Sequence, residues 1–138
     1  GDFARLIDID IKSDETDMLS VRADGVIIST PTGSTAYSLA AGGPVLSPDL
    51  NCFVITSICP HSLMDRSLVV NSKYTLNISV HSDVSNNAIL TCDGEKPVEI
   101  GTGCSAAISL SNYKAKLIKI KPDNFYQIVK KKIIERGA

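Results

Sequence analysis

The residues with the clearest chemical meaning lie in one stretch, Thr30–Tyr37, which reads Thr-Pro-Thr-Gly-Ser-Thr-Ala-Tyr. Four hydroxyl side chains and a Pro–Gly turn stand there at the start of a short predicted helix over Ser34–Ala41. Amide groups exposed at such a start have partial positive charge and suit an anion or a sugar hydroxyl. Tyr37 adds an aromatic ring on which a purine can stack, a contact worth roughly 1–3 kcal/mol by analogy with stacked bases. Phosphate, ribose and base make up a nucleotide, so nucleotide binding is one interpretation.

The same spacing also fits a purely structural helix cap. Ser and Thr side chains satisfy unpaired amides at helix starts, and a Pro–Gly turn only redirects the chain. Neither G-x-x-x-x-G-K-[ST] nor G-x-G-x-x-G, the two common phosphate-binding fingerprints, occurs in the sequence. The residues alone therefore leave both interpretations open.

Short strands are expected to position this turn, in a mainly β, layered, β-sandwich-like fold. Residues Phe3–Ile11 become alternately apolar and polar after Leu6, the period of a half-buried strand, and Val26–Ile28 is an apolar run typical of a buried one. Asn, Asp, Gly or Pro separate most of the other candidates. These further strand candidates are Met18–Val21, Cys52–Thr56, Ser67–Val70, Lys73–Val80, Ala88–Cys92, Pro97–Ile100, Ser105–Leu110 and Ala115–Ile120.

Two helices complete the prediction. The short helix after the Thr-Pro-Thr-Gly turn is stopped by Gly42-Gly43-Pro44. A C-terminal helix over Asn124–Arg136 has apolar residues at helical spacing, with Asp123 as its N-cap and Gly137 as its stop. Since no repeat or low-complexity linker divides the 138 residues, we expect a single domain over residues 1–138.

Composition excludes some classes of partner. A net charge of -1 gives no electrostatic reason to expect nucleic acid or an anionic membrane. No apolar run approaches the roughly 18 residues that span a bilayer. The start, Gly1-Asp2-Phe3, has neither Met nor a charged-then-apolar leader, so we expect no signal peptide, a cytoplasmic protein and further sequence upstream.

The four cysteines predict reduced thiols. None belongs to a C-x-x-C pair, and Cys52, Cys59 and Cys92 stand in apolar stretches, which favours packed thiols in a reducing compartment. Zinc binding through Cys59 and His61 would need a second pair of ligands at a spacing that the sequence does not offer. We therefore expect no metal site in this chain.

A longer block resembles the signature of the ATP- or polyphosphate-dependent NAD kinases. It consists of Asp24-Gly25 and then Ser29–Pro44, which reads S-T-P-T-G-S-T-A-Y-S-L-A-A-G-G-P. Sixteen residues of this kind are far more specific than one Gly-rich loop. Further matches follow in the same order, so that the resemblance extends from about residue 6 to residue 125: Ile58–Leu63, Arg66–Val70 and Cys92–Glu95.

The resemblance implies an activity for the complete enzyme. NAD kinases transfer the terminal phosphoryl group of ATP, or of polyphosphate, to the 2′-hydroxyl of the adenosine ribose of NAD and so make NADP. They do so with Mg²⁺ or another divalent metal. This chain resembles their β-rich C-terminal domain, which binds NAD and forms homodimers or homotetramers. The N-terminal α/β domain of the family would then be its missing partner.

Nine residues match dinucleotide-binding positions of the family, and the resemblance alone gives them that role. Asp24 would accept hydrogen bonds from polar groups of the dinucleotide, and Asp93 would lie on a turn that faces the same cleft. On their residue types alone, Asp24 also fits a bulge and Asp93-Gly94 a hairpin turn. The nine are Asp24, Thr32, Thr35, Ala36, Tyr37, Ala40, Cys59, His61 and Asp93.

The remaining positions form two groups in the resemblance. Thr35 and Ala36 would line the adenine end, which Tyr37 flanks, and Thr32 and Ala40 would belong to the same wall. The other two, at positions 59 and 61, would approach the nicotinamide, partly through their backbone. A lone histidine such as the one at position 61 equally fits a structural role.

The catalytic Gly-Gly-Asp-Gly-Thr segment of the family and its Asn-Glu pair do not occur in this sequence. We therefore expect no catalytic residue here, no kinase activity from the chain alone and weak binding of NAD at best. Two other classes stay open: a non-catalytic β-sandwich interaction module and a relative of the lipid kinases. Thr35-Ala36-Tyr37 within the long block favours NAD over a lipid.

Overall fold

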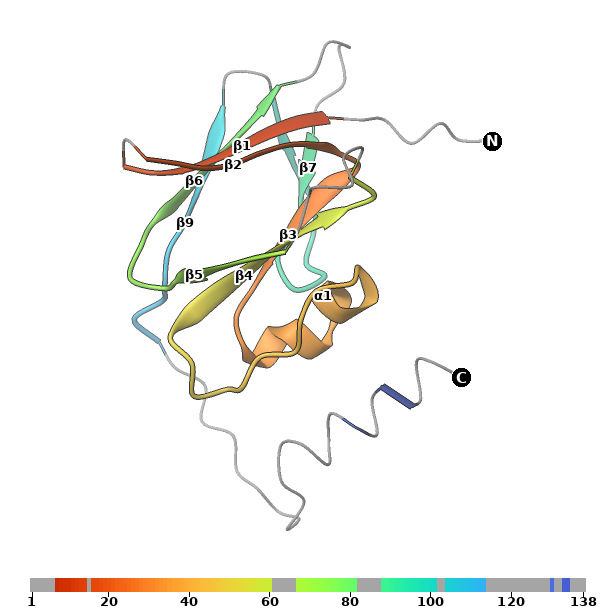
Figure 1. Cartoon of the computed structure of the whole chain (residues 1–138). Helices are drawn as coiled ribbons and strands as arrows, with labels where there is room; N and C mark the ends of the chain where they lie inside the picture. The colour runs from red at the N-terminus through yellow and green to blue at the C-terminus, as the bar shows by residue number, and fades with distance from the viewer. Residues whose placement is uncertain are drawn as a thin grey trace.

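The computed structural model describes residues 7–14, 16–60, 67–81, 88–101, 104–113, 130 and 133–134. Two layers of antiparallel strands dominate it, as Figure 1 shows, so the predicted mainly β class is confirmed. The strands are β1 (Ile7–Ser13), β2 (Thr16–Ala23), β3 (Gly25–Ser29), β4 (Cys52–Ile58), β5 (Leu68–Asn71), β6 (Leu76–His81), β7 (Ala88–Leu90), β8 (Val98–Ile100) and β9 (Ser105–Ile108).

The strands form three sheets. A four-stranded sheet has the order β2-β1-β6-β9, a three-stranded sheet has the order β3-β4-β5, and β7 and β8 form a two-stranded hairpin. The chain leaves the first sheet at Ala23, the last residue of β2, and enters the second at Gly25, the first residue of β3. Asp24 therefore lies where the chain crosses between the two layers.

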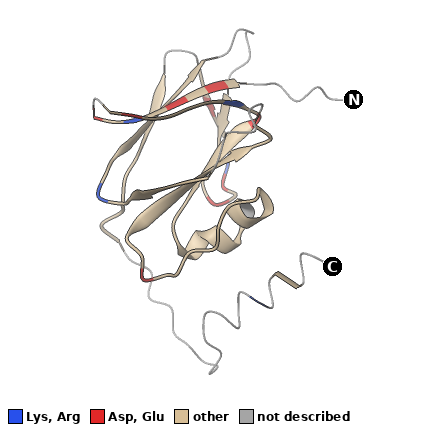
Figure 2. Ribbon diagram, in the orientation of Figure 1, with Lys and Arg blue, Asp and Glu red and all other residues tan. Residues whose placement is uncertain are grey.

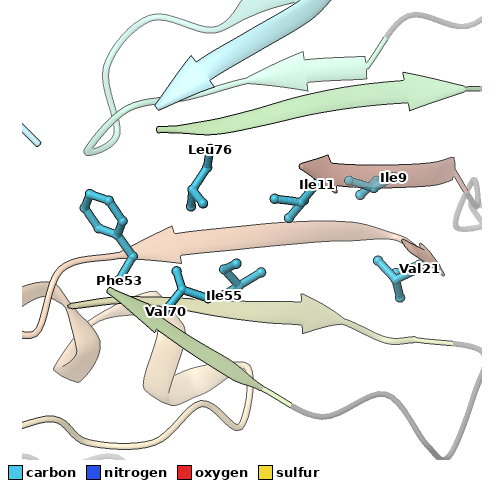
Figure 3. Packing of buried hydrophobic residues seen from close by; sticks show 8 residues of the cluster. Ile9, Ile11, Val21, Phe53, Ile55, Val70 and Leu76 are labelled. Atoms are coloured by element: carbon cyan, nitrogen blue, oxygen red, sulfur yellow. The ribbon is translucent and has the colours of Figure 1, made fainter. Parts of the chain in front are cut away.

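The hydrophobic core lies between the two larger sheets, as Figure 3 shows. Ile11 and Leu76 come from the four-stranded sheet and Ile55 from the three-stranded one, and all three are fully buried. Burying such a side chain stabilises the fold by roughly 1.5–3 kcal/mol. The other buried members of this cluster are Ile9, Val21, Ala23, Phe53 and Val70.

Strand β4 is buried on both of its faces. Phe53 and Ile55 point toward the four-stranded sheet, while Val54 points to the opposite side, because side chains alternate along a strand. On that outer side Val54 packs with Cys52 and Leu46 in a second cluster. Coverage on both faces explains why β4 reads as a continuous apolar run.

Strand β3, in contrast, is half-buried along its whole length. The apolar run Val26–Ile28 predicted a buried strand, and this prediction is wrong because the strand is only half-buried. The reason is its position, because among the described strands β3 is an edge of its sheet and pairs with β4 alone.

The predicted helix over Ser34–Ala41 is two short helices. A 3-10 helix, η1 (Thr32–Thr35), comes first, and a single turn of α-helix, α1 (Tyr37–Ala40), follows it. Ala36 separates them because its backbone, at φ -93° and ψ -126°, is not helical. The prediction of one continuous helix is therefore wrong, although the segment is helical on both sides of Ala36.

Several predicted boundaries shift by a few residues. The strand predicted from Lys73 begins at Leu76, because Asn71 closes a turn by accepting hydrogen bonds from the amides of Lys73 and Tyr74. Of the C-terminal helix predicted over Asn124–Arg136, the described residues at 130, 133 and 134 are helical. The strand predicted over Ala115–Ile120 lies outside the described residues. Within the part of the chain that is described, no helix has the length and apolarity needed to cross a membrane.

Candidate functional site

The crossing point between the two sheets brings two of the predicted residues together. The backbone amide of Asp24 donates a hydrogen bond to the carbonyl of Ile58 at 3.0 Å, and Gly25 pairs with Ile58 in the sheet. In an antiparallel pair the next residues along, Asp24 and Cys59, are therefore neighbours. Asp24 is half-buried, and Cys59 is exposed with a left-handed backbone at φ 48°. A carboxylate and a thiol thus share this end of the β3–β4 pair.

The turn at the other end of β3 is held by its own backbone and hydroxyl groups. The amide of Gly33 donates to Thr30 Oγ1 at 3.1 Å, and the amide of Ser34 donates to the carbonyl of Pro31 at 3.2 Å. The amide of Ala36 in turn donates to the carbonyl of Gly33 at 3.1 Å. The first two bonds satisfy amides at the start of η1, as the cap interpretation requires, and the third closes the end of η1 at Ala36.

Ser34 points into the protein and is fully buried. Its hydroxyl donates to the carbonyl of Pro31 at 2.6 Å and accepts a hydrogen bond from the amide of Leu46 at 3.1 Å. Ser38, on α1, is also buried, and its hydroxyl lies 3.1 Å from the hydroxyl of Thr56 on β4. Both serines therefore join the helical segment to the rest of the fold.

Three of the predicted residues are exposed in the same segment, and we call them the exposed row: Thr32, Ala36 and Ala40. Ala36 and Ala40 are one helical turn apart, and the amide of Ala40 bonds to the carbonyl of Ala36 at 3.4 Å. Thr32 belongs to η1, before the break in the helix at Ala36. Thr35 differs, because its side chain is buried and its hydroxyl lies 3.5 Å from the carbonyl of Thr32. Tyr37 is the first residue of α1.

Asp93 lies on a third element, the turn of the β7–β8 hairpin. It is exposed with a left-handed backbone at φ 49°, and Gly94 follows at φ 74°. The amide of Glu95 closes the turn on the carbonyl of Cys92 at 2.8 Å. This geometry is the hairpin turn that Asp-Gly predicts. The ninth predicted residue, His61, lies outside the described residues.

The exposure of the cysteine thiols differs from what the sequence predicted. Cys52 is buried, and this burial raises the pKa of its thiol. Cys59, Cys92 and Cys104 are exposed, so the packed thiols expected at positions 59 and 92 are wrong. Cys59 follows the last residue of β4, and Cys92 lies in the hairpin turn, so their apolar neighbours do not cover them. All four are free thiols, and the described residues contain no group of three or more His, Cys, Asp or Glu that would hold a metal ion.

A pocket of about 320 Å³, which the sequence did not indicate, lies beside Thr30 on the core side of the turn. Ile28, Phe53 and Ile108 supply apolar walls, and Tyr113 stands at its edge. No charged side chain lines it among the residues that the structure describes. Its walls therefore do not match the phosphates of a dinucleotide.

Comparison with known proteins gives the family of the chain. Residues 1–120 match the family described as the ATP-NAD kinase C-terminal domain. The chain belongs to this family. Its resemblance to NAD kinases, carried by the block Ser29–Pro44, is thereby confirmed.

Sequence relatives of the chain include the NAD kinases of two organisms. The NAD kinase of Carboxydothermus hydrogenoformans is 44% identical over 98% of this chain and 48% of the relative. That of Treponema denticola is 42% identical over 98% of this chain and 48% of the relative. The chain thus spans about half the length of the curated relatives that it matches.

Two solved structures share the fold. The NAD kinase from Archaeoglobus fulgidus, in complex with ATP, has 30% identity and a TM-score of 0.71 over 81% of this chain and 42% of its own. The yeast NADH kinase complexed with NADH has 35% identity and a TM-score of 0.62 over 73% of this chain and 30% of its own. Both therefore extend well beyond the part that resembles this chain.

Proposed function

We propose that this chain is the dinucleotide-binding part of an NAD kinase. In the complete enzyme the terminal phosphoryl group of ATP, or of polyphosphate, is transferred to the 2′-hydroxyl of the adenosine ribose of NAD. Membership of the family and the NAD kinase relatives support this proposal. So do the solved relatives, one of which is complexed with ATP and the other with NADH.

The observation that supports the site best is the exposed row Thr32, Ala36 and Ala40. Small side chains on an exposed surface let a flat ligand approach the backbone closely. The hydroxyl groups of the neighbouring buried serines are occupied within the protein. We infer that the adenosine half contacts this row, while Asp24 and Cys59 contact other parts of the dinucleotide from the opposite end of β3.

A bulky residue in the row tests the site. In the complete polypeptide that contains this chain, we expect Ala36→Leu to raise KM for NAD about tenfold, the factor that corresponds to roughly 1.4 kcal/mol of binding. Ala107 on β9 is an exposed alanine on the outer face of the other sheet, so Ala107→Leu is the matched control. An Ala36→Leu enzyme with an unchanged KM for NAD would remove the row from the site and favour a non-catalytic interaction module.

The chain alone is proposed to be inactive. Phosphoryl transfer requires donor, metal and acceptor to be held together, and the family's catalytic segment does not occur in this sequence. We assign the divalent metal to the complete enzyme and its ATP, as the resemblance to the family implies. Incubation of the chain with ATP, Mg²⁺ and NAD is expected to give no NADP, and calorimetric titration is expected to find weak binding of NAD. Formation of NADP by the chain alone would contradict this proposal.

The proposed partners are the N-terminal domain of the enzyme and further copies of this chain. Homodimers or homotetramers are inferred from the resemblance to the family, as is a cytoplasmic location. Sedimentation of the complete enzyme as a monomer would contradict the assembly.

A further inference from the structure

The short helix α1, which bears Ala40 of the exposed row, is too short to be stable by itself. A helix of four residues is far below the length at which isolated helices are stable in water, roughly 12–15 residues. Its placement therefore depends on tertiary contacts. The hydroxyl of Ser38 on α1 provides one such contact, and Ser34 on the neighbouring η1 provides another through the amide of Leu46.

The contact at Ser38 continues into a chain of three hydroxyl groups. Ser38 on α1 lies 3.1 Å from Thr56 on β4, and Thr56 Oγ1 lies 3.5 Å from the hydroxyl of Ser67, just before β5. Thr56 is 2% exposed and Ser38 is 1% exposed. Because neither hydroxyl reaches bulk water, each depends on the other as a partner. Thr56 thus stands between α1 and the start of β5.

Gly43 lets these groups come together. Its amide donates to the carbonyl of Ser38 at 2.8 Å. A Cβ atom at this position would lie 2.6 Å from Thr56 Oγ1 and 2.8 Å from the Ser38 carbonyl, and closer still to the Ser38 hydroxyl. The backbone after α1 therefore closes over the hydroxyl pair and fixes the distance between helix and sheet.

We propose that Thr56 is a positioning residue for the dinucleotide site. Its hydroxyl sets the placement of α1 on the sheet, and thereby the position of Ala36 and Ala40 at the surface. This inference rests on the proposed function for its effect on NAD. The placement of α1 is a separate physical claim that does not depend on the ligand.

The test compares three substitutions in the complete polypeptide. Thr56→Val removes the hydroxyl and keeps the branched shape, and Thr56→Ser retains the hydroxyl. Ser57→Ala is the matched control on the next residue, because the Ser57 hydroxyl is buried without a hydrogen-bond partner among the described residues. We expect Thr56→Val to raise KM for NAD about tenfold with kcat nearly unchanged, as the loss of one buried hydrogen bond at a positioning group would produce. Thr56→Ser and Ser57→Ala should resemble the parent protein.

Amide hydrogen exchange separates the two parts of the proposal. In Thr56→Val the amides of Ala40 and Gly43 should exchange faster, while those of the hydrophobic core keep their protection. If the parent enzyme makes no NADP, the proposed function fails, and faster exchange confined to α1 would still support the positioning role. Unchanged exchange around α1 would overturn the proposal. So would a Thr56→Val enzyme that melts at a lower temperature yet keeps the parent KM for NAD.

Discussion

The two large sheets differ in what lies on their outer faces. Segments η1 and α1 cover the outer face of the three-stranded sheet over β3 and β4, and the hydroxyl groups of Ser34 and Ser38 are buried beneath them. The outer face of the four-stranded sheet is open, and its polar groups pair at the surface. Arg22 Nε lies 3.0 Å from Asp8 Oδ1, with both side chains about half exposed. Figure 2 shows charges along β1 and β2 but none on η1 or α1.

This difference in burial indicates on which face the loss of a hydrogen-bond partner lowers the free energy of unfolding. On the open face, water replaces a lost partner, so an exposed ion pair contributes about 0–1 kcal/mol. On the covered face no water is at hand, so a hydroxyl or amide that loses its partner keeps the whole cost of its desolvation. The part of the candidate site on η1 and α1 lies on the covered side, where buried hydrogen bonds join it to the rest of the fold.

The largest expected effect comes from closing the space over the hydroxyl pair. Gly43→Ala places a methyl group against Ser38 and Thr56, so we expect it to lower the free energy of unfolding by about 3 kcal/mol. Gly42 is the control because it has a left-handed backbone at φ 87°, and a methyl group there would meet no described atom within 4 Å. Gly42→Ala should cost about 1 kcal/mol from backbone strain alone. Urea denaturation followed by circular dichroism measures both, and equal costs would mean that α1 moves aside freely.

A matched pair of serine substitutions compares the two faces directly. Ser34→Ala leaves the amide of Leu46 without its hydrogen-bond partner inside the protein, so we expect a loss of about 2 kcal/mol. Ser20→Ala removes a hydrogen bond to Asp10 at 2.6 Å on the open face, where a change within about 0.5 kcal/mol is expected. Urea denaturation of the two variants gives the difference. Equal losses would contradict the distinction between the faces.

The smallest expected effect on stability comes from ionisation of the Cys52 thiol. Burial raises the pKa of Cys52, so the folded protein holds its thiol proton more tightly than the unfolded chain. Stability from this group is therefore present below the unfolded pKa and falls as pH rises above it. Iodoacetamide followed by mass spectrometry should modify Cys59, Cys92 and Cys104 in the folded protein and Cys52 only after unfolding. Rapid modification of Cys52 under native conditions would show that the second cluster opens readily.

Local patterns predicted most of the strands, because each pattern reports which face of a strand is covered. Alternation placed Ile9 and Ile11 in the core and Asp8 outside, and the structure agrees. The strand breaks at Asp24 and at Asn71 likewise follow from turn chemistry. Family resemblance, rather than spacing, supplied the dinucleotide-binding residues.

Long-range partners explain what the sequence did not predict. Ser34 and Ser38 point inward because Leu46 and Thr56 lie there, and no local pattern specifies such distant neighbours. The break at Ala36 lies between these two inward-pointing serines. Exposure of Cys59 depends on where β4 ends, and strand ends are the least predictable feature of a strand.

The centre of strand β4, at Val54 and Ile55, pairs with both β3 and β5, and it has the main core on one face and the second cluster on the other. We expect the amides at the centre of β4 to exchange with deuterium only when the two layers separate, because both edges and both faces are covered there. The slowest-exchanging amides of Cys52–Ile58 would therefore report the global free energy of unfolding. A denaturant series on this strand alone would measure the stability of the domain.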